Sequence, residues 1–398
     1  MKSAILSPST TFLLFFFFYH HFCAAEQAAR KWLNTEGKEI TATYLKVDGE
    51  NVMLKLANGK TVPYPILKLS KNDQDFITSL AANQTKAGQD DDTVNFDDKW
   101  PESVTFRDNS DIEIVAEDDE KKEYVYRSRN YEYKCDVKLN QSVVRTFSRL
   151  FEATYEYCRA VPLALNGSQK SDEKLSILLF ETHASYVKAG GPPPSAGVYI
   201  PSRNVIMVPL ESLGVKKIGG GYSVDREKTN NTLPHEITHQ LTPQAYFQSG
   251  SMGWFSEGIA EYIASTPYNN GLYRVKGNFS GIESYATDFG KGGKGGRALG
   301  KDIKVGNLKN YMMQSYSSFT ANGNFNYGVG VLVTYYFLHL DGKGDGARIK
   351  SFLKALRAGK SGTDALDVLL DGRTFEDLEK EITLKFKKER LNITFGSK

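Results

Sequence analysis

The sequence predicts an α+β protein with a small β-rich N-terminal unit and a larger mixed domain. Short β-rich runs, separated by Asp-Gly and Asn-Gly turns, fill residues 39–64. Apolar and polar residues alternate over 111–116 and 123–138, as in half-buried strands. From Thr232 onward, apolar residues recur mainly at helical spacing. We therefore expect strands first and helices afterwards in the larger domain.

The composition of the 398-residue chain is that of a folded protein. It is 40% hydrophobic and 12% aromatic, which argues against wholesale disorder. The formal net charge of +3 is near zero for this length. It gives no support for a nucleic-acid partner or for strong binding to a membrane surface.

The first 25 residues have the pattern of a signal peptide. Lys2 is followed by the apolar run Phe12–Phe18, and the small residues Ala24 and Ala25 suit a cleavage site after Ala25. The apolar run is too short to span a bilayer, and no other stretch approaches that length. We expect an exported protein, periplasmic or extracellular, whose mature part has no membrane span.

The N-terminal unit is predicted over residues 29–78 as a small barrel of short strands. Its strands are expected at Glu39–Lys46, Asn51–Leu56 and Thr61–Tyr64. The patterns R-x-W, G-K-x-x-x-A, V-x-L-x-x-x-N-G-K and L-x-L-S-x-x-D run through it. The residues that carry these patterns are Arg30, Trp32, Gly37, Ala42, Val52, Leu54, Gly59, Lys60, Leu69, Ser70 and Asp73.

This set resembles the bacterial domain related to the first homology domain of the yeast endocytic adaptor Sla. The resemblance implies an SH3-like barrel that binds a protein or a cell-wall ligand. A structural cap without a ligand stays open as the alternative.

An acidic linker is predicted at 79–100, with Gln89–Asp92 at its centre, and one further domain at 101–392. The elements expected early in that domain are a helix, a buried strand and a hairpin, at Gln141–Arg159, Leu175–Phe180, and Gly197–Ile200 with Val205–Val208. Cys135 and Cys158 are the two cysteines that follow the signal peptide. They could form a disulfide in an oxidising compartment or remain two buried free thiols.

The candidate site lies in residues 232–264, which read TLPHEITHQLTPQAYFQSGSMGWFSEGIAEYIA. A helix capped by Thr232 places His235 and His239 on one face, because residues four apart are neighbours. Two imidazoles at this spacing suit a zinc ion. Glu236 lies beside them, where it could take a proton from an attacking water.

A second helix supplies the acidic residues that a catalytic zinc site still needs. Ser256 can cap it, and Glu257 at its start is the candidate third ligand, which leaves a fourth position for water. Glu261, one turn later, can accept a hydrogen bond from the other nitrogen of a ligating histidine. The sequence therefore predicts one Zn²⁺ per chain.

This arrangement resembles the gluzincin metallopeptidases, which include thermolysin and the aminopeptidase N family. In them, H-E-x-x-H is followed by a glutamate ligand in an N-E-G or N-E-A helix. The resemblance implies that His235, His239 and Glu257 bind zinc. It also implies that Glu236 is the general base and that Glu261 supports a ligand.

A third segment, Asn326–Tyr336, reads NYGVGVLVTYY. Aminopeptidase-N-like enzymes carry Y-x-x-G before an apolar helix in the corresponding region, and Tyr327 and Gly330 match it. The resemblance implies that Tyr327 stabilises the oxyanion of the tetrahedral intermediate. It also implies an edge strand beside the zinc for an extended peptide, at Gly197–Ile200 or Val205–Val208.

The chain departs from the aminopeptidase pattern in three ways. It has no G-x-M-E-N motif, S-E-G replaces N-E-G, and the gap between His239 and Glu257 is one residue shorter. Specificity for a free amino terminus is therefore not predicted.

The sequence thus predicts an exported zinc metallopeptidase that acts on a peptide or protein substrate. One alternative is a non-catalytic protein that binds peptide or cell-wall polymer on the same scaffold. Another is a zinc hydrolase for a non-peptide substrate. The presence of Glu236 favours an enzyme, because a binding scaffold needs the histidines but has no use for that carboxylate.

Overall fold

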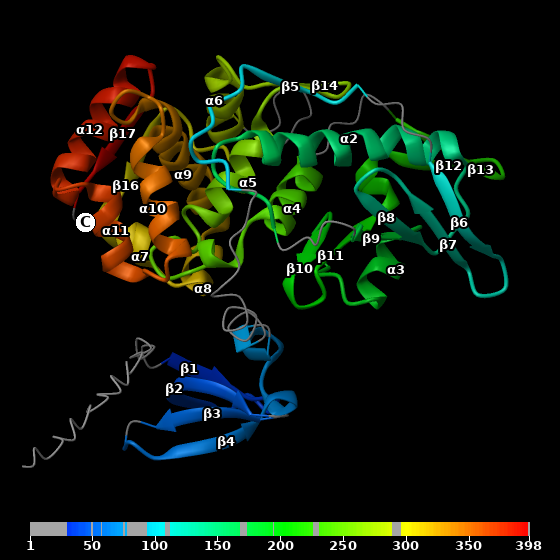
Figure 1. Ribbon diagram of the computed structural model, residues 1–398, viewed down its shortest axis with the longest axis horizontal. Helices are drawn as coiled ribbons and strands as arrows, with labels where there is room; N and C mark the ends of the chain where they lie inside the picture. Colours follow the sequence, from blue (N-terminus) through cyan, green and yellow to red (C-terminus); the bar gives the residue numbers. More distant parts are fainter. Residues whose placement is uncertain are drawn as a thin grey trace, which may run out of the picture. The chain divides into compact units, whose positions relative to one another are not determined.

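The protein is α+β and divides into two compact units, residues 1–82 and 83–398 (Figure 1). The computed structural model describes residues 30–48, 51–56, 58–74, 76–77, 94–107, 112–167, 173–193, 195–225, 231–288 and 296–396. The predicted signal peptide lies outside these ranges, as does the predicted linker up to residue 93. The last part of that linker packs onto the second unit, where Phe96 is buried.

The first unit is an antiparallel sheet of four strands in the order β1-β2-β3-β4. The strands are β1 Arg30–Leu33, β2 Glu39–Asp48, β3 Asn51–Leu56 and β4 Thr61–Pro65, followed by the 3₁₀ turn η1 Ile66–Lys68. All three predicted strands are confirmed. The predicted small barrel is not closed among the described residues, because β1 and β4 are the two edges of the sheet and do not pair with each other. The end of β1 instead meets the segment after η1, where Asn34 forms an isolated bridge with Leu69.

The residues behind the Sla-type pattern hold this first unit together. The buried carboxylate of Asp73 accepts hydrogen bonds from the Arg30 guanidinium at 2.7 Å, from Leu33 N at 2.7 Å and from Ser70 Oγ at 2.9 Å. The guanidinium of Arg30 lies 4.7 Å from the ring centroid of Trp32, which is fully buried. These residues of the pattern therefore form a structural cluster that joins β1 to the segment after η1.

A six-stranded mixed sheet, in the order β10-β11-β9-β8-β7-β6, begins the second unit. The strands are β6 Glu113–Asp118, β7 Glu123–Arg127, β8 Tyr131–Cys135, β9 Leu175–Phe180, β10 Val198–Ile200 and β11 Val205–Pro209. Strands β8, β9 and β11 are parallel, and the other pairs are antiparallel. The predicted buried strand and hairpin are confirmed. Of the two segments of the hairpin, β10 is the edge strand and β11 is internal.

Helix α2, Gln141–Ala160, confirms the predicted helix and packs on the sheet. Its Phe147 and Phe151 contact Tyr131 and Tyr133 of β8, with ring centroids 5.2–5.4 Å apart. Figure 1 shows α2 running along the sheet, while helices α7 and α9 to α12 gather at the end of this unit away from β6 and β7. Within the described ranges, no helix combines the length and the apolar character needed to cross a membrane.

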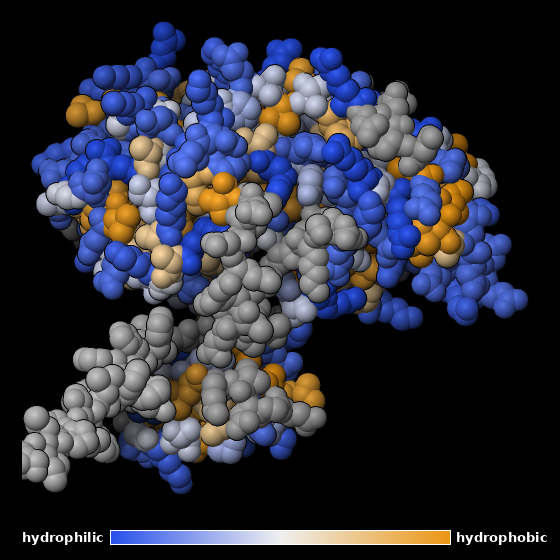
Figure 2. Space-filling view, viewed as in Figure 1, coloured by the Kyte–Doolittle hydropathy of each residue, from blue (hydrophilic) through white to orange (hydrophobic). Residues whose placement is uncertain are grey.

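The remaining elements surround this framework. They are β5 Ser103–Thr105, α3 His183–Lys188, η2 Pro201–Arg203, η3 Leu210–Leu213, β12 Val215–Ile218, β13 Gly221–Val224, α4 Thr232–Leu241, η4 Gln244–Tyr246, α5 Ser256–Ser265, β14 Tyr268–Asn269, β15 Leu272–Arg274, α6 Phe279–Thr287, β16 Asp302–Val305, α7 Leu308–Met313, α8 Tyr316–Ala321, α9 Gly323–Tyr335, the π-helical turn η6 Tyr336–Leu340, α10 Ala347–Arg357, α11 Gly362–Leu370, α12 Phe375–Lys388 and β17 Asn392–Phe395. Hydrophilic residues cover most of the viewed face of this unit, with an apolar patch beside β6 (Figure 2). There β6 exposes Ile114 and Val115 at an irregularity in its pairing, which blunts the edge of the sheet.

Cys135 and Cys158 are both buried and free, so the disulfide considered above is not formed. Cys135 ends β8, whereas Cys158 lies in the last turns of α2 and faces α4, with its Sγ 3.7 Å from Thr238 Oγ1. Burial raises the pKa of both thiols to about 12. The alternative of two buried free thiols therefore describes this chain.

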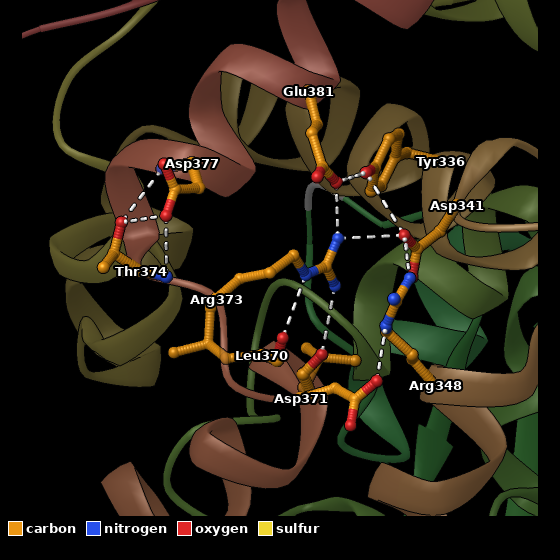
Figure 3. A network of polar contacts seen from close by, with 10 residues as sticks. Tyr336, Asp341, Arg348, Leu370, Asp371, Arg373, Thr374, Asp377 and Glu381 are labelled. Carbon is orange, nitrogen blue, oxygen red and sulfur yellow. Dashed lines mark hydrogen bonds and ion pairs between the residues drawn. The ribbon is translucent and has the colours of Figure 1, made fainter.

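A buried carboxylate, Asp341, joins the C-terminal helices (Figure 3). Its Oδ1 accepts hydrogen bonds from Arg348 of α10 at 2.9 Å and from Arg373, between α11 and α12, at 3.0 Å. The Tyr336 hydroxyl lies between Asp341 and Glu381 of α12, at 3.3 and 3.1 Å. One carboxylate thus links η6, α10 and the connection between α11 and α12.

We expect the Asp341→Asn variant to lower the free energy of unfolding by about 3 kcal/mol, because it leaves two arginines beside an uncharged buried group. The matched control is Asp371→Asn, since Asp371 also pairs with Arg348, at 3.0 Å, but is 65% exposed. That change should cost about 0–1 kcal/mol. Urea denaturation measures both, and equal losses would contradict a special role for Asp341.

Candidate metal centre

Helix α4 presents the two histidines on the side opposite its buried face. Leu233, Ile237 and Leu241 are buried against the surrounding helices, while His235 and His239 lie one turn apart at the edge of the core. The helix begins at Thr232, with Asn231 in the cap position and no side-chain cap. The predicted cap was therefore one residue off, and the helix ends at Leu241.

Helix α5 is buried from Ser256 to Ala264 and carries both acidic residues of the site. Phe255 holds the cap position, so the predicted cap at Ser256 was also one residue off. The Ser256 hydroxyl instead accepts a hydrogen bond from Gly253 N at 3.0 Å, which ties the loop to the helix start. Glu257 follows directly and is 3% exposed.

Helices α5 and α9 cross in backbone contact where Gly258 meets Gly330. A Cβ atom on Gly258 would lie 2.6 Å from the Gly330 carbonyl oxygen and 2.2 Å from Thr334 Oγ1. Gly258 therefore has no room for a side chain, whereas a Cβ atom on Gly330 would lie 3.7 Å from the Cα atom of Gly258. The crossing brings the start of α5, with Glu257, close to the start of α9, with Tyr327.

Three ligand atoms converge between α4 and α5. The Nε2 atoms of His235 and His239 are 2.9 Å apart, and each lies 3.2 Å from Oε2 of Glu257. Around a tetrahedral zinc ion with bonds of about 2.0–2.1 Å, ligand atoms are about 3.3 Å apart. The spacing of this triad therefore fits a zinc ion. Among the described residues, no second group of three such side chains brings its ligand atoms this close together.

The charges around the triad also fit a divalent cation. Three carboxylates lie here, those of Glu236, Glu257 and Glu261. Among the described residues, Arg297 forms an ion pair with Glu261. Burial alone would lower the pKa of His235, but Glu257 and Glu261 outweigh it and hold that pKa well above its usual value. Burial would likewise raise the pKa of Glu257, but the two imidazoles hold it well below its usual value. The site therefore favours added positive charge, as a metal ion would supply.

Glu236 lies between the triad and the edge of the sheet. Its Oε2 accepts a hydrogen bond from the backbone N–H of Tyr199 in β10 at 2.7 Å. Burial raises the pKa of Glu236, and the two imidazoles partly oppose this rise. The predicted base is thus held by the predicted edge strand.

Glu261 supports His235 from behind. Its Oε1 lies 3.4 Å from Nδ1 of His235, so it faces the nitrogen that the triad does not use. Arg297 pairs with the same carboxylate, and its guanidinium lies 4.8 Å from the ring centroid of Tyr327. Sequence reasoning missed Arg297. It is a single arginine after a glycine-rich stretch, and nothing in that pattern indicates a role at the site.

Tyrosines cover the other side of the triad. The ring of Tyr327 stacks on His235, with centroids 6.1 Å apart and planes at 24°. Sequence reasoning missed Tyr316 of α8, whose hydroxyl donates to Oε1 of Glu257 at 3.0 Å. No motif surrounds it. His183 and His339 lie outside this cluster, and they form hydrogen bonds with Ser195 O and with the Tyr262 hydroxyl, respectively.

Comparison with known proteins adds no relative: no family model matches the chain, and no curated protein is significantly similar to it.

We expect the Gly258→Ala variant to lose about 2 kcal/mol of unfolding free energy, because its Cβ would force α5 away from α9. The same shift moves Glu257, so metal binding should weaken as well. Gly323→Ala is the matched control at the start of α9, where the nearest atom to an added Cβ is 3.7 Å away. Chemical denaturation measures the free energy of unfolding of both variants. A Gly258→Ala protein as stable as wild type would contradict the close crossing of α5 and α9.

Proposed function

We propose that this protein is an exported zinc metallopeptidase. The observation that carries the proposal is the convergence of His235 Nε2, His239 Nε2 and Glu257 Oε2 within 3.2 Å of one another, with Glu236 alongside. A zinc ion held by these three residues would polarise a substrate carbonyl and make a neighbouring water more acidic. The arrangement has three protein ligands, as catalytic zinc sites do, rather than the four of structural sites.

Glu236 is the proposed general base. Its carboxylate takes a proton from the attacking water as the water oxygen bonds to the carbonyl carbon. It returns that proton to the amide nitrogen as the C–N bond breaks, so no other reactant is needed. The raised pKa of Glu236 suits a group that must both accept and release a proton near neutral pH.

Tyr327 is the proposed donor to the oxyanion. Burial raises the pKa of its hydroxyl, so the hydroxyl keeps its proton and can donate a hydrogen bond. The edge strand β10 supports the choice of a peptide substrate, because an extended chain can pair with the edge of a sheet and this edge lies next to Glu236.

The first unit is proposed to be an SH3-like domain of the Sla type that binds a protein or a cell-wall ligand. Its antiparallel strands and the Arg30–Trp32–Asp73 cluster support this assignment. In this scheme it recognises a partner and takes no part in hydrolysis.

Metal content tests the centre directly. We expect about one zinc per chain in protein that starts at residue 26, and none in the His239→Ala variant, because two remaining ligands hold zinc poorly. His183→Ala removes a histidine outside the cluster and should keep about one. Elemental mass spectrometry gives the counts. A wild-type chain without zinc, when zinc is supplied during folding, would sink the proposal.

Hydrolysis tests the role of Glu236. We expect Glu236→Gln to keep its zinc and to cleave a peptide library about 10²–10⁴-fold more slowly than wild type, since the amide cannot accept the proton. Undiminished cleavage would remove Glu236 as the base. A wild-type protein that holds zinc and cleaves nothing would favour the non-catalytic binding protein instead.

A further inference from the structure

The two oxygens of Glu257 have different partners. Oε2 faces both histidine nitrogens at 3.2 Å, and Oε1 accepts the hydrogen bond from the Tyr316 hydroxyl at 3.0 Å. A carboxylate can bind a metal through one oxygen or through both. The partner of Oε1 therefore bears on how many positions Glu257 would fill.

We propose that Tyr316 is a positioning residue that keeps Glu257 a one-oxygen ligand and so leaves a fourth position open. The proposal rests on the zinc centre proposed above. A hydrogen bond to a carboxylate is stronger than one between neutral groups, and the low exposure of Glu257 strengthens it further. Without this donor, Oε1 is free to turn toward the metal and to occupy the position that water needs.

The placement of Tyr316 argues against a role in packing. The residue begins the short helix α8 and is 45% exposed, yet its hydroxyl reaches inward to a carboxylate that is 3% exposed. Loss of the hydroxyl removes little from the core.

The two tyrosines of the site have separate roles. Tyr327 stacks on His235 and lies against Arg297, whereas Tyr316 bonds the third ligand. Their hydroxyls also interact, but the proton of the Tyr316 hydroxyl is donated to Glu257. Removing the Tyr327 hydroxyl should therefore slow turnover and leave the binding mode of Glu257 unchanged.

Cobalt(II) replaces zinc as a visible probe, because its absorption bands respond to the identity and geometry of its ligand atoms. We expect the bands of the Tyr316→Phe protein loaded with Co²⁺ to differ from wild type in position and intensity, because a carboxylate oxygen replaces water as the fourth ligand atom. Tyr268→Phe is the control, since it removes a hydroxyl from a tyrosine of β14 that is 36% exposed. It should match wild type. If the Tyr316→Phe spectrum equals those of wild type and of Tyr268→Phe, the proposal is overturned.

Azide gives a second readout that needs no comparison of band strengths. It should change the wild-type Co²⁺ spectrum by entering the open position and should change that of Tyr316→Phe at least about tenfold less effectively. Equal azide binding by both proteins would contradict the inference while the metal centre stands. A wild-type protein that takes up neither Zn²⁺ nor Co²⁺ would overturn the centre and this inference together.

Discussion

The contact between Gly258 and Gly330 is the constraint on which the site depends. Two helices that touch through their backbones have little freedom to slide, because the hydroxyl of Thr334 and the Gly330 carbonyl fill the space beside Gly258. This contact fixes the distance between Glu257 on α5 and Tyr327 near the start of α9. Helix α4 then needs only to pack on α5 for its histidines to reach Glu257.

Charge gives the site its second constraint. A cluster of carboxylates with one arginine is not stable in a protein interior unless further positive charge is present. Arg297 pairs with Glu261, behind His235. The negative charge that remains unbalanced therefore lies at the triad itself. A proton on His235, whose pKa the neighbouring carboxylates raise, or the zinc ion proposed above would supply the positive charge.

The core of the site could be predicted because it depends on local geometry. The period of an α-helix alone puts His235 and His239 on one face, and the start of the next helix locates Glu257. Tyr316 and Arg297 could not be found in this way, since long-range packing brings them to the site from segments without a motif. The helix caps were one residue off because the chain enters both helices in helical conformation. Barrel closure and the disulfide depend on whether distant elements meet, which periodicity does not report.

The two buried thiols have a consequence for the covalent structure of the folded second unit. Thiolates carry out disulfide exchange and bind soft metals, and a pKa of about 12 leaves almost none at neutral pH. The folded second unit therefore contains no disulfide whose formation depends on the redox potential of its surroundings. It keeps the same covalent structure in a reducing or an oxidising compartment, and its native state offers zinc no sulfur ligand from these cysteines that would compete with the histidines.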